Sequence, residues 1–179
     1  MKYKFGEIVV IALGGSVINP GEINSGFLKN FRKFILKWIK RGKKFVIVTG
    51  GGSIARNYQK AGSKVLKLSN EDKDWIGIHA TRLNAHLLRT IFSQEAHPVI
   101  IDSHSKIKTL NNQLKIKNYK AIIASGWRPG WSTDYIALQL ADNFQAKEAI
   151  IAGSPAYVYP VISRMKTVNQ LEKRHPYLI

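Results

Sequence analysis

Two glycine-rich loops in this sequence are placed where phosphate groups bind in many α/β proteins. Residues 14–16, Gly-Gly-Ser, follow the apolar run 8–13, and residues 50–53, Gly-Gly-Gly-Ser, follow the apolar run 45–48. A glycine loop at the end of a strand lets backbone N–H groups approach an anion without interference from a Cβ atom. We therefore predict two facing phosphate subsites, and two tight turns without a ligand are the alternative.

A basic side chain follows the second of these loops. The loop runs into a helical segment that contains Arg56. A helix N-terminus adds the positive end of its dipole to an anion site, and an arginine one turn into the helix can form a forked hydrogen bond with the same phosphate. Neither loop has the Gly-Lys-Ser/Thr ending of a Walker motif, which disfavours ordinary P-loop chemistry.

A third segment with chemical potential joins an expected strand to an expected helix at residues 125–134. Trp127 and Trp131 offer faces on which a ring can stack, two hydroxyl residues follow them, and Asp134 is the one carboxylate. Core packing is the alternative for the tryptophans. Helix capping is the alternative for Asp134.

A fourth segment, Asp72-Lys73-Asp74, begins another expected helix. Acids at a helix start usually complement its dipole, which is the interpretation we favour for Asp72. Asp74 can instead accept a hydrogen bond from a ligand hydroxyl. His79 and His86 lie seven residues apart on one face without a third ligand, so ordinary packing is favoured over a metal site.

The elements that must position these residues alternate between strand and helix. The strand-length runs are apolar on both faces, which favours a largely parallel sheet that is buried on both sides. They cover residues 8–13, 45–48, 98–101, 121–124 and 149–152. Helical patterns are expected between Asn24, a cap, and Gly42, a stop, then at about 71–92 after a cap at Ser69 or Asn70, and from about Thr133. This alternation predicts a three-layer α/β/α sandwich.

The composition limits the classes of protein without choosing among them. The 179 residues fit one domain, no apolar stretch is long enough for a membrane-spanning helix, and there is no cysteine. The absence of cysteine excludes disulfides and thiolate metal sites and fits a cytoplasmic protein. The formal charge of +17 attracts phosphates of any kind, so a generally basic surface, steering of an anionic substrate and nucleic-acid binding are the alternatives.

The four motifs, taken in order, resemble the uridylate kinases of the amino acid kinase superfamily in their archaeal-like form. The resemblance covers roughly residues 8–159. It implies an α/β/α sandwich with a mainly parallel sheet, usually assembled as a homo-hexamer. It also implies transfer of the ATP γ-phosphoryl group to UMP in the presence of Mg²⁺, a step of pyrimidine nucleotide biosynthesis that gives UDP. A catalytically impaired nucleotide-binding paralogue or truncated product is the alternative, and a basic nucleic-acid-binding module is the less favoured one.

The resemblance also implies roles for individual residues. The UMP side comprises a phosphate loop, a ribose-hydroxyl acceptor and a cover over the uracil and phosphate. These are, in that order, Gly51, Gly52 and Arg56, then Asp74, then the loop from Gly126 to Thr133 that includes Trp127. Asp134 is the expected catalytic carboxylate that organises the reacting groups. The loop near the transferred phosphoryl group, on the ATP side, is Gly14, Gly15 and Ser16. No metal site made of protein ligands is expected.

Three departures from the family pattern concern the ATP side. Ala12 stands where many superfamily members carry lysine, although archaeal-like uridylate kinases often lack it too. Ser154 and Ala156 stand where the family has Asn and Asp near the ATP phosphates, and the family continues with further sheet and helix. We therefore expect a kinase-like domain at 1–160 with an incomplete ATP half, a divergent basic tail at 161–179, and UMP binding with slow or absent phosphoryl transfer.

Overall fold

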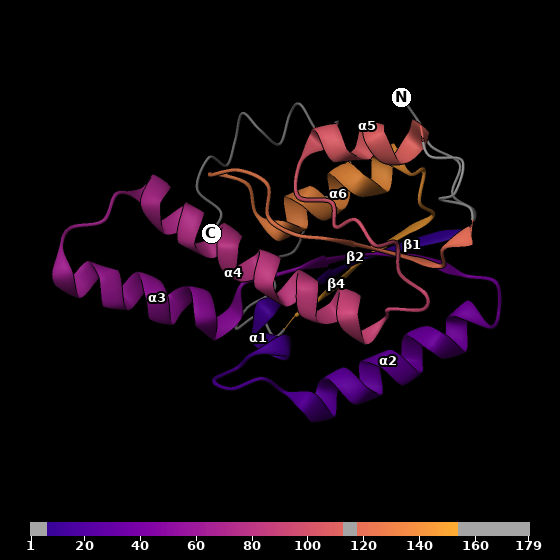
Figure 1. Ribbon diagram of the computed structural model, residues 1–179, viewed down its shortest axis with the longest axis horizontal. Helices are drawn as coiled ribbons and strands as arrows, with labels where there is room; N and C mark the ends of the chain where they lie inside the picture. The colour runs from indigo at the N-terminus through magenta and orange to yellow at the C-terminus, as the bar shows by residue number, and fades with distance from the viewer. Residues whose placement is uncertain (1–6, 113–117, 154–179) are drawn as a thin grey trace, which may run out of the picture.

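A four-stranded parallel sheet is the centre of the structure in the residues that the computed structural model describes, 7–112 and 118–153 (Figure 1). The strands are β1 (Ile8–Leu13), β2 (Lys44–Thr49), β3 (Ala121–Ala124) and β4 (Glu148–Ala152), in the order β3-β2-β1-β4. In the register of the sheet, Val10 of β1 pairs with Val46 of β2 and with Ala149 of β4. Strand β2 extends one residue beyond each end of the apolar run at 45–48, from which it was predicted.

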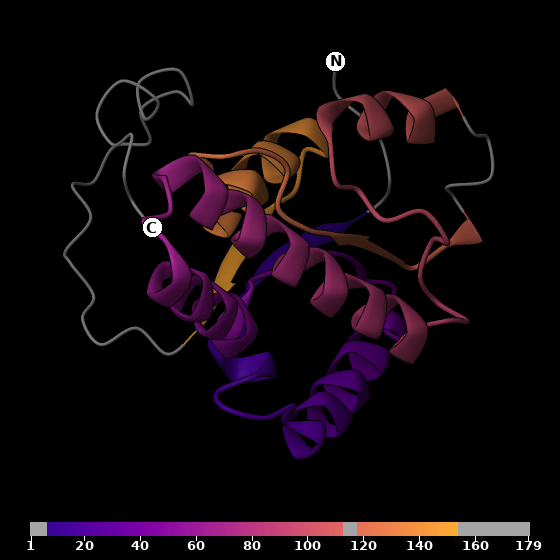
Figure 2. The same cartoon turned by 60° about the vertical axis from the view of Figure 1, so that its left-hand side comes forward.

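Helices cover both faces of this sheet. Alternate strand residues such as Val10 and Val46 join a core cluster with residues of α5 (His104–Asn112) and α6 (Thr133–Asn143). Their neighbours in the strands join a second cluster with α2 (Ser25–Ile39) and α4 (Asn70–Ile91). Figures 1 and 2 show α5 and α6 on one side of the sheet and α2 and α4 on the other. The predicted three-layer α/β/α sandwich is confirmed.

The helix boundaries follow from local capping. Asn24 accepts a hydrogen bond from the amide of Phe27 at 2.9 Å and begins α2. Ser69 and Asp72 form a capping box at the start of α4, which supports the structural interpretation of Asp72. After α2, Gly42 has a φ of +88°, a backbone conformation that favours glycine and ends the helical path.

Two further helices follow the first two strands. Helix α1 (Gly15–Ile18) follows β1 directly, and α3 (Gly52–Val65) follows β2 and packs against α4. None of the helices in the described ranges combines the length and the apolar character needed to cross a bilayer.

The run at residues 98–101 does not form the predicted strand. It contacts β3 through an isolated bridge between Ile101 and Ala124, and the amide of Ile101 donates to the carbonyl of Ile123 at 2.9 Å. Pro98 has no backbone N–H to donate, so a continuous ladder cannot start there. The apolar pattern identified the position of this segment beside the sheet but not its hydrogen bonding.

The expectation that every strand is buried on both faces is wrong for β4. Ile150 is 42% exposed and Ile151 is 63% exposed. Strand β4 pairs with β1 on one side, and no described residue pairs with its other edge. A strand at the edge of a sheet has fewer neighbours to cover its side chains, so an apolar run alone overestimates its burial.

Candidate functional site

The candidate site lies at one edge of the sheet, where the carboxyl ends of the parallel strands meet. Gly14 follows β1, Gly50 follows β2, and Ser125 follows β3. In open parallel sheets ligands bind outside this edge. The structure therefore brings together the first three motifs that the sequence singled out.

The two glycine loops touch each other, backbone against backbone. A Cβ atom on Gly15 would lie 2.6 Å from the carbonyl carbons of both Gly50 and Gly51, which is closer than real Cβ contacts allow. Gly52 has a φ of +67° and also packs directly on the backbone of Gly15. Close packing of the loops thus accounts for several of these glycines without a ligand. The phosphate-binding roles of Gly14, Gly15 and Ser16 stay predictions.

A buried polar pair joins the second loop to the residue that follows α1. The Ser53 hydroxyl donates to the Oδ1 atom of Asn19, and the amide of Ser53 donates to the Asn19 carbonyl at 3.1 Å. Asn19 is 4% exposed and Ser53 is 6% exposed. The hydroxyl of Ser53 is therefore hydrogen-bonded to Asn19 inside the protein. The glycines that precede Ser53 lie at the edge of the sheet.

The start of α3 has the features of an anion site. Among the described residues no side chain caps this helix, whose N-cap residue is Gly51. Arg56 lies near the helix start, is exposed, and has no hydrogen bond or ion pair with any described residue. The Ser53 amide already donates to the Asn19 carbonyl. The other N–H groups at the helix start and the guanidinium of Arg56 are suited to bind one phosphate.

Polar side chains of α4 contact both candidate ligand loops. Asn84 donates from Nδ2 to the carbonyl of Gly50 at 2.7 Å. Asp74 accepts at Oδ2 from the amide of Gly130 at 2.8 Å. Asp74 therefore lies where α4 meets the loop at 126–133. The expected contact between Asp74 and a ribose hydroxyl stays a prediction, and it would use the second carboxylate oxygen, Oδ1.

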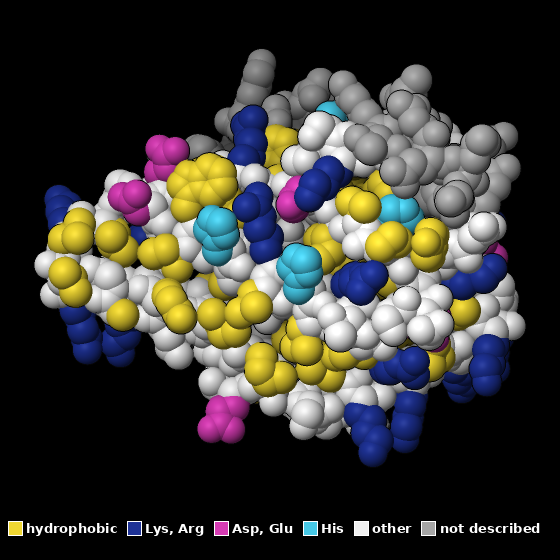
Figure 3. Space-filling model, in the orientation of Figure 1, with side chains coloured by type: hydrophobic (Ala, Val, Ile, Leu, Met, Phe, Trp, Pro, Cys, Tyr) yellow, Lys and Arg dark blue, Asp and Glu magenta, His cyan; other side chains and the backbone are white. Residues whose placement is uncertain are grey.

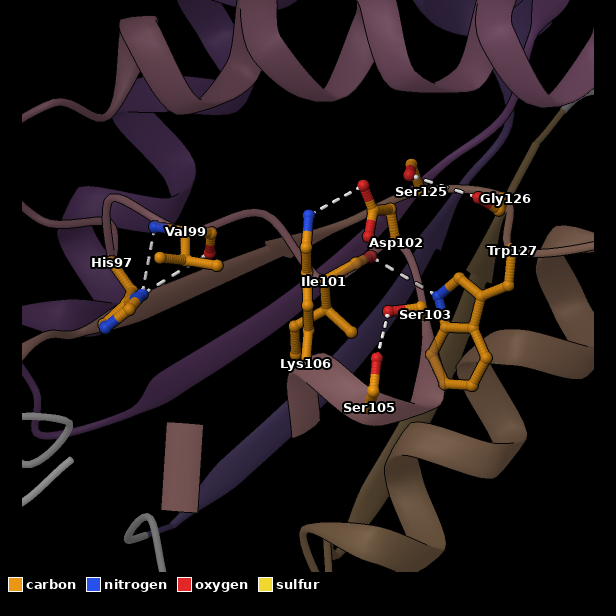
Figure 4. Close-up of polar contacts among 10 residues, drawn as sticks. All are labelled: His97, Val99, Ile101, Asp102, Ser103, Ser105, Lys106, Ser125, Gly126 and Trp127. Atoms are coloured by element: carbon orange, nitrogen blue, oxygen red, sulfur yellow. Dashed lines mark hydrogen bonds and ion pairs between the residues drawn. The ribbon is translucent and has the colours of Figure 1, made fainter. Parts of the chain in front are cut away.

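For Trp127, the structure supports the core-packing alternative. This residue is 7% exposed, belongs to the core cluster under α6, and donates from its indole nitrogen to the Ile101 carbonyl at 3.3 Å (Figure 4). Trp131 is partly buried, with the Arg128 guanidinium 4.5 Å from its ring centre. The Trp127 ring is therefore packed into the core and is not an exposed stacking surface.

Asp134 is not the cap of α6. Ser132 accepts the capping hydrogen bond from the amide of Tyr135 at 3.1 Å, and Asp134 follows in the first helical turn. Its side chain reaches solvent, and partial burial of the carboxyl raises its pKa above the ordinary aspartate value. The capping alternative is therefore wrong for Asp134, which leaves its carboxylate available for another role.

The structure adds one carboxylate that the sequence motifs did not include. The bridge from Ile101 to β3 places Asp102 at the same edge as Ser125, and Lys106 donates to Asp102 at 2.8 Å (Figure 4). An acid that directly follows an apolar run is the signal that could have identified it. Asp102 is held in an ion pair here, so Asp134 remains the stronger catalytic candidate.

Comparison with known proteins identifies the family of this chain. Its sequence matches the profile of the amino acid kinase family over residues 7–160. The chain belongs to the amino acid kinase family. This match covers the sheet and the loops of the candidate site.

Several relatives of this amino acid kinase family member have known names or structures. It is 33% identical over 151 residues to the uridylate kinase of Thermococcus kodakarensis, covering 84% of this chain and 64% of that protein. The uridylate kinase structure from Archaeoglobus fulgidus has 31% identity and a TM-score of 0.69, over 89% of this chain and 68% of that one. A Bacillus anthracis UMP kinase has 21% identity and a TM-score of 0.65, which supports the fold alone. The chain thus spans a little under two thirds of its Thermococcus relatives.

The described residues of this family member suit a magnesium ion that is bound together with a nucleotide. In the described ranges, no group of three His, Cys, Asp or Glu residues could hold a metal ion. Mg²⁺ in kinase sites is bound mainly by phosphate oxygens and water, with one or two carboxylates. Asp134 fits that limited role. Ser154 and Ala156, the altered ATP-side positions, lie outside the described residues.

Proposed function

We propose that this chain is a UMP kinase, which transfers the γ-phosphoryl group of ATP to UMP. The observation that carries this proposal is the start of α3, where no described residue caps the helix or pairs with Arg56. Helix α4 contacts both this loop and the loop at 126–133. The start of α3 is suited to a phosphate, and the loop at 126–133 lies where it can contact a base. The names of the archaeal relatives support UMP as that nucleotide.

The proposed roles follow from the position of each residue. The phosphate of UMP binds at Gly51, Gly52 and Arg56, and the free oxygen of Asp74 accepts a ribose hydroxyl. Backbone groups of the 126–133 loop contact the uracil. Phosphoryl transfer depends mainly on positioning and charge neutralisation. Asp134 orients the reacting groups, and Mg²⁺ bound with ATP neutralises charge on the phosphates.

A coupled assay of ADP release from ATP and Mg²⁺, with and without UMP, tests this function. We expect UMP-dependent release of ADP to be slower than the roughly 1–100 per second of ordinary kinases. The reason is that Ser154 and Ala156 stand where the family that this sequence resembles has Asn and Asp. UMP binding without any release would favour the alternative of a nucleotide-binding paralogue. Failure to bind UMP would overturn the proposal. Nucleic-acid affinity that falls steeply with salt would indicate the third alternative.

Replacing Arg56 with alanine should weaken UMP binding by about 1.5–3 kcal/mol, the typical contribution of a hydrogen bond to a charged group. Isothermal titration calorimetry measures this difference. Lys60→Ala removes an exposed charge farther along α3 and serves as the control. Equal UMP affinities for wild type and the Arg56 variant would remove Arg56 from the site.

A homo-oligomer in the cytoplasm is part of the same proposal, with the hexamer of the resembling family as the expected form. Hydrophobic side chains gather over α3 and α4 (Figure 3) and line a groove of about 570 Å³ that includes Tyr58, Trp75 and Leu83. Exposed apolar surface of this kind favours contact between subunits. Light scattering should detect an assembly larger than one chain, and a monomer at assay concentrations would contradict this part.

A further inference from the structure

One face of α4 carries the polar side chains that contact the candidate ligand loops. Asp74, Thr81 and Asn84 are spaced by seven and three residues, so they align along the helix. Thr81 and Asn84 lie at buried positions of this helix, which are usually apolar, as Ile78 and Leu88 are. Thr81 is 7% exposed and Asn84 is 1% exposed. Buried polar side chains that contact loop backbone indicate a role in holding those loops.

Asn84 holds the loop proposed to bind the UMP phosphate. Its Nδ2 atom donates to the carbonyls of Gly50, at 2.7 Å, and Gly51, at 3.3 Å. The amide nitrogen must face these two acceptors, because the opposite orientation would place an oxygen against both carbonyls. The Oδ1 atom is buried and accepts no hydrogen bond from the described residues. The orientation is thus determined by the loop carbonyls.

Thr81 holds the loop proposed to contact the base. Its hydroxyl donates to the Ile78 carbonyl at 2.6 Å and accepts from the amide of Gly126 at 2.7 Å. A Cβ atom on Gly126 would lie 2.9 Å from this hydroxyl oxygen, so loop and helix are in close contact. Thr81 therefore fixes the first residue of the loop at 126–133.

Thr49 connects these contacts to the sheet. This fully buried residue ends β2, and its hydroxyl lies 2.8 Å from the Thr81 carbonyl and 3.3 Å from the Ala124 carbonyl at the end of β3. Helix α4 is therefore joined to the ends of the strands from which both loops emerge. The separation between the two loops depends on this helix together with the pairing of β2 and β3.

We propose that Asn84 and Thr81 are positioning residues with separate tasks: Asn84 sets the phosphate subsite, and Thr81 sets the base subsite. The inference rests on the proposed UMP binding and deepens it. Because the two residues lie within one turn of α4, the helix links the position of the phosphate subsite to that of the base subsite. Neither side chain needs to touch the nucleotide, since each acts through the backbone of its loop.

Thr81→Val tests the base subsite, because valine keeps the shape and removes the acceptor of the Gly126 amide. We expect the ratio of UMP to CMP affinity, measured by calorimetry, to fall about tenfold, as for loss of a buried hydrogen-bond partner. The ratio of UMP to uridine affinity should not change. Thr81→Ser keeps the hydroxyl and should restore the UMP to CMP ratio. Thr90→Val, the same replacement at an exposed position late in α4, is the control.

Asn84→Ala tests the phosphate subsite by removing the donor to both glycine carbonyls. We expect the ratio of UMP to uridine affinity to fall about tenfold, with the UMP to CMP ratio unchanged. Asn70→Ala, at the exposed start of α4, is the control. Should Asn84→Ala fail to fold, the Thr81 variants decide the inference.

The outcomes separate this inference from the proposed function. Wild-type protein that does not bind UMP would overturn the function and the inference together. Wild-type binding, with variants that have lower melting temperatures but unchanged affinity ratios, would overturn the inference alone, because a purely structural role changes stability without changing the ratios. The inference would be supported if Thr81→Val lowered only the UMP to CMP ratio and Asn84→Ala lowered only the UMP to uridine ratio.

Discussion

Replacing Asp134 with asparagine should lower the rate of UMP phosphorylation by about 100-fold or more while UMP affinity changes little. Asparagine keeps the shape of the side chain and removes its charge. Ser132 already caps α6, so the loss of charge at Asp134 leaves the capping hydrogen bond in place. A coupled kinase assay and calorimetry with UMP measure the two quantities. Asp142→Asn, at the other end of α6, is the control and should leave the rate unchanged.

The pH dependence of folding separates this effect from misfolding. Partial burial raises the pKa of Asp134, so the folded chain disfavours its ionised form more than the unfolded chain does. The resulting loss of stability is present above the folded-state pKa and disappears as the pH falls below the ordinary aspartate value. The asparagine variant should therefore melt no lower than wild type at neutral pH. A wild-type rate in this variant would exclude a catalytic role for Asp134.

Replacing Gly15 with alanine should destabilise the fold by about 3 kcal/mol or more, because backbone rather than a flexible side chain would have to move. The added Cβ atom would lie 2.6 Å from the carbonyl carbons of Gly50 and Gly51. Denaturation in urea measures the free energy of unfolding.

A second glycine of the same region provides the matched comparison. A Cβ atom on Gly21 meets no heavy atom within 4 Å, so Gly21→Ala should change the free energy of unfolding by less than about 0.5 kcal/mol. If Gly15→Ala were equally mild, the two loops could not be packed together as the structure places them.

Local sequence patterns predicted those parts of the fold that depend on interactions between residues close together in the sequence. Periodic apolar residues and capping residues such as Asn24 and Ser69 predicted α2, α4 and α6, because caps and amphipathic faces are properties of neighbouring residues. The apolar runs at 8–13, 45–48, 121–124 and 149–152 predicted all four described strands to within one residue at each end. Helix α5 and the short α1 were not predicted, since both are short elements with little periodicity of their own.

The candidate site was predicted in its loops but not in its supporting contacts. The glycine motifs identified two loops that the structure places at the sheet edge, and the resemblance singled out Asp74, which contacts the loop at 126–133. However, the contact of Gly15 with Gly50 joins residues that are distant in sequence, and no local pattern encodes it. Asn84 and Thr81 carry a signal that was overlooked: polar residues at buried positions of an otherwise amphipathic helix.

The position of β1 in the sheet has a consequence for synthesis of the chain on the ribosome. Strand β1 pairs with β2 on one side and with β4 on the other, where Val9 is matched with Glu148. Glu148 is made about 100 residues after Thr49, the end of β2, so at about 5–20 residues per second roughly 5–20 seconds pass between the two partners. During that interval, one edge of a strand whose six residues are all buried in the finished fold lacks its neighbour. The nascent chain therefore presents an apolar strand edge that a holding chaperone can protect until β4 emerges.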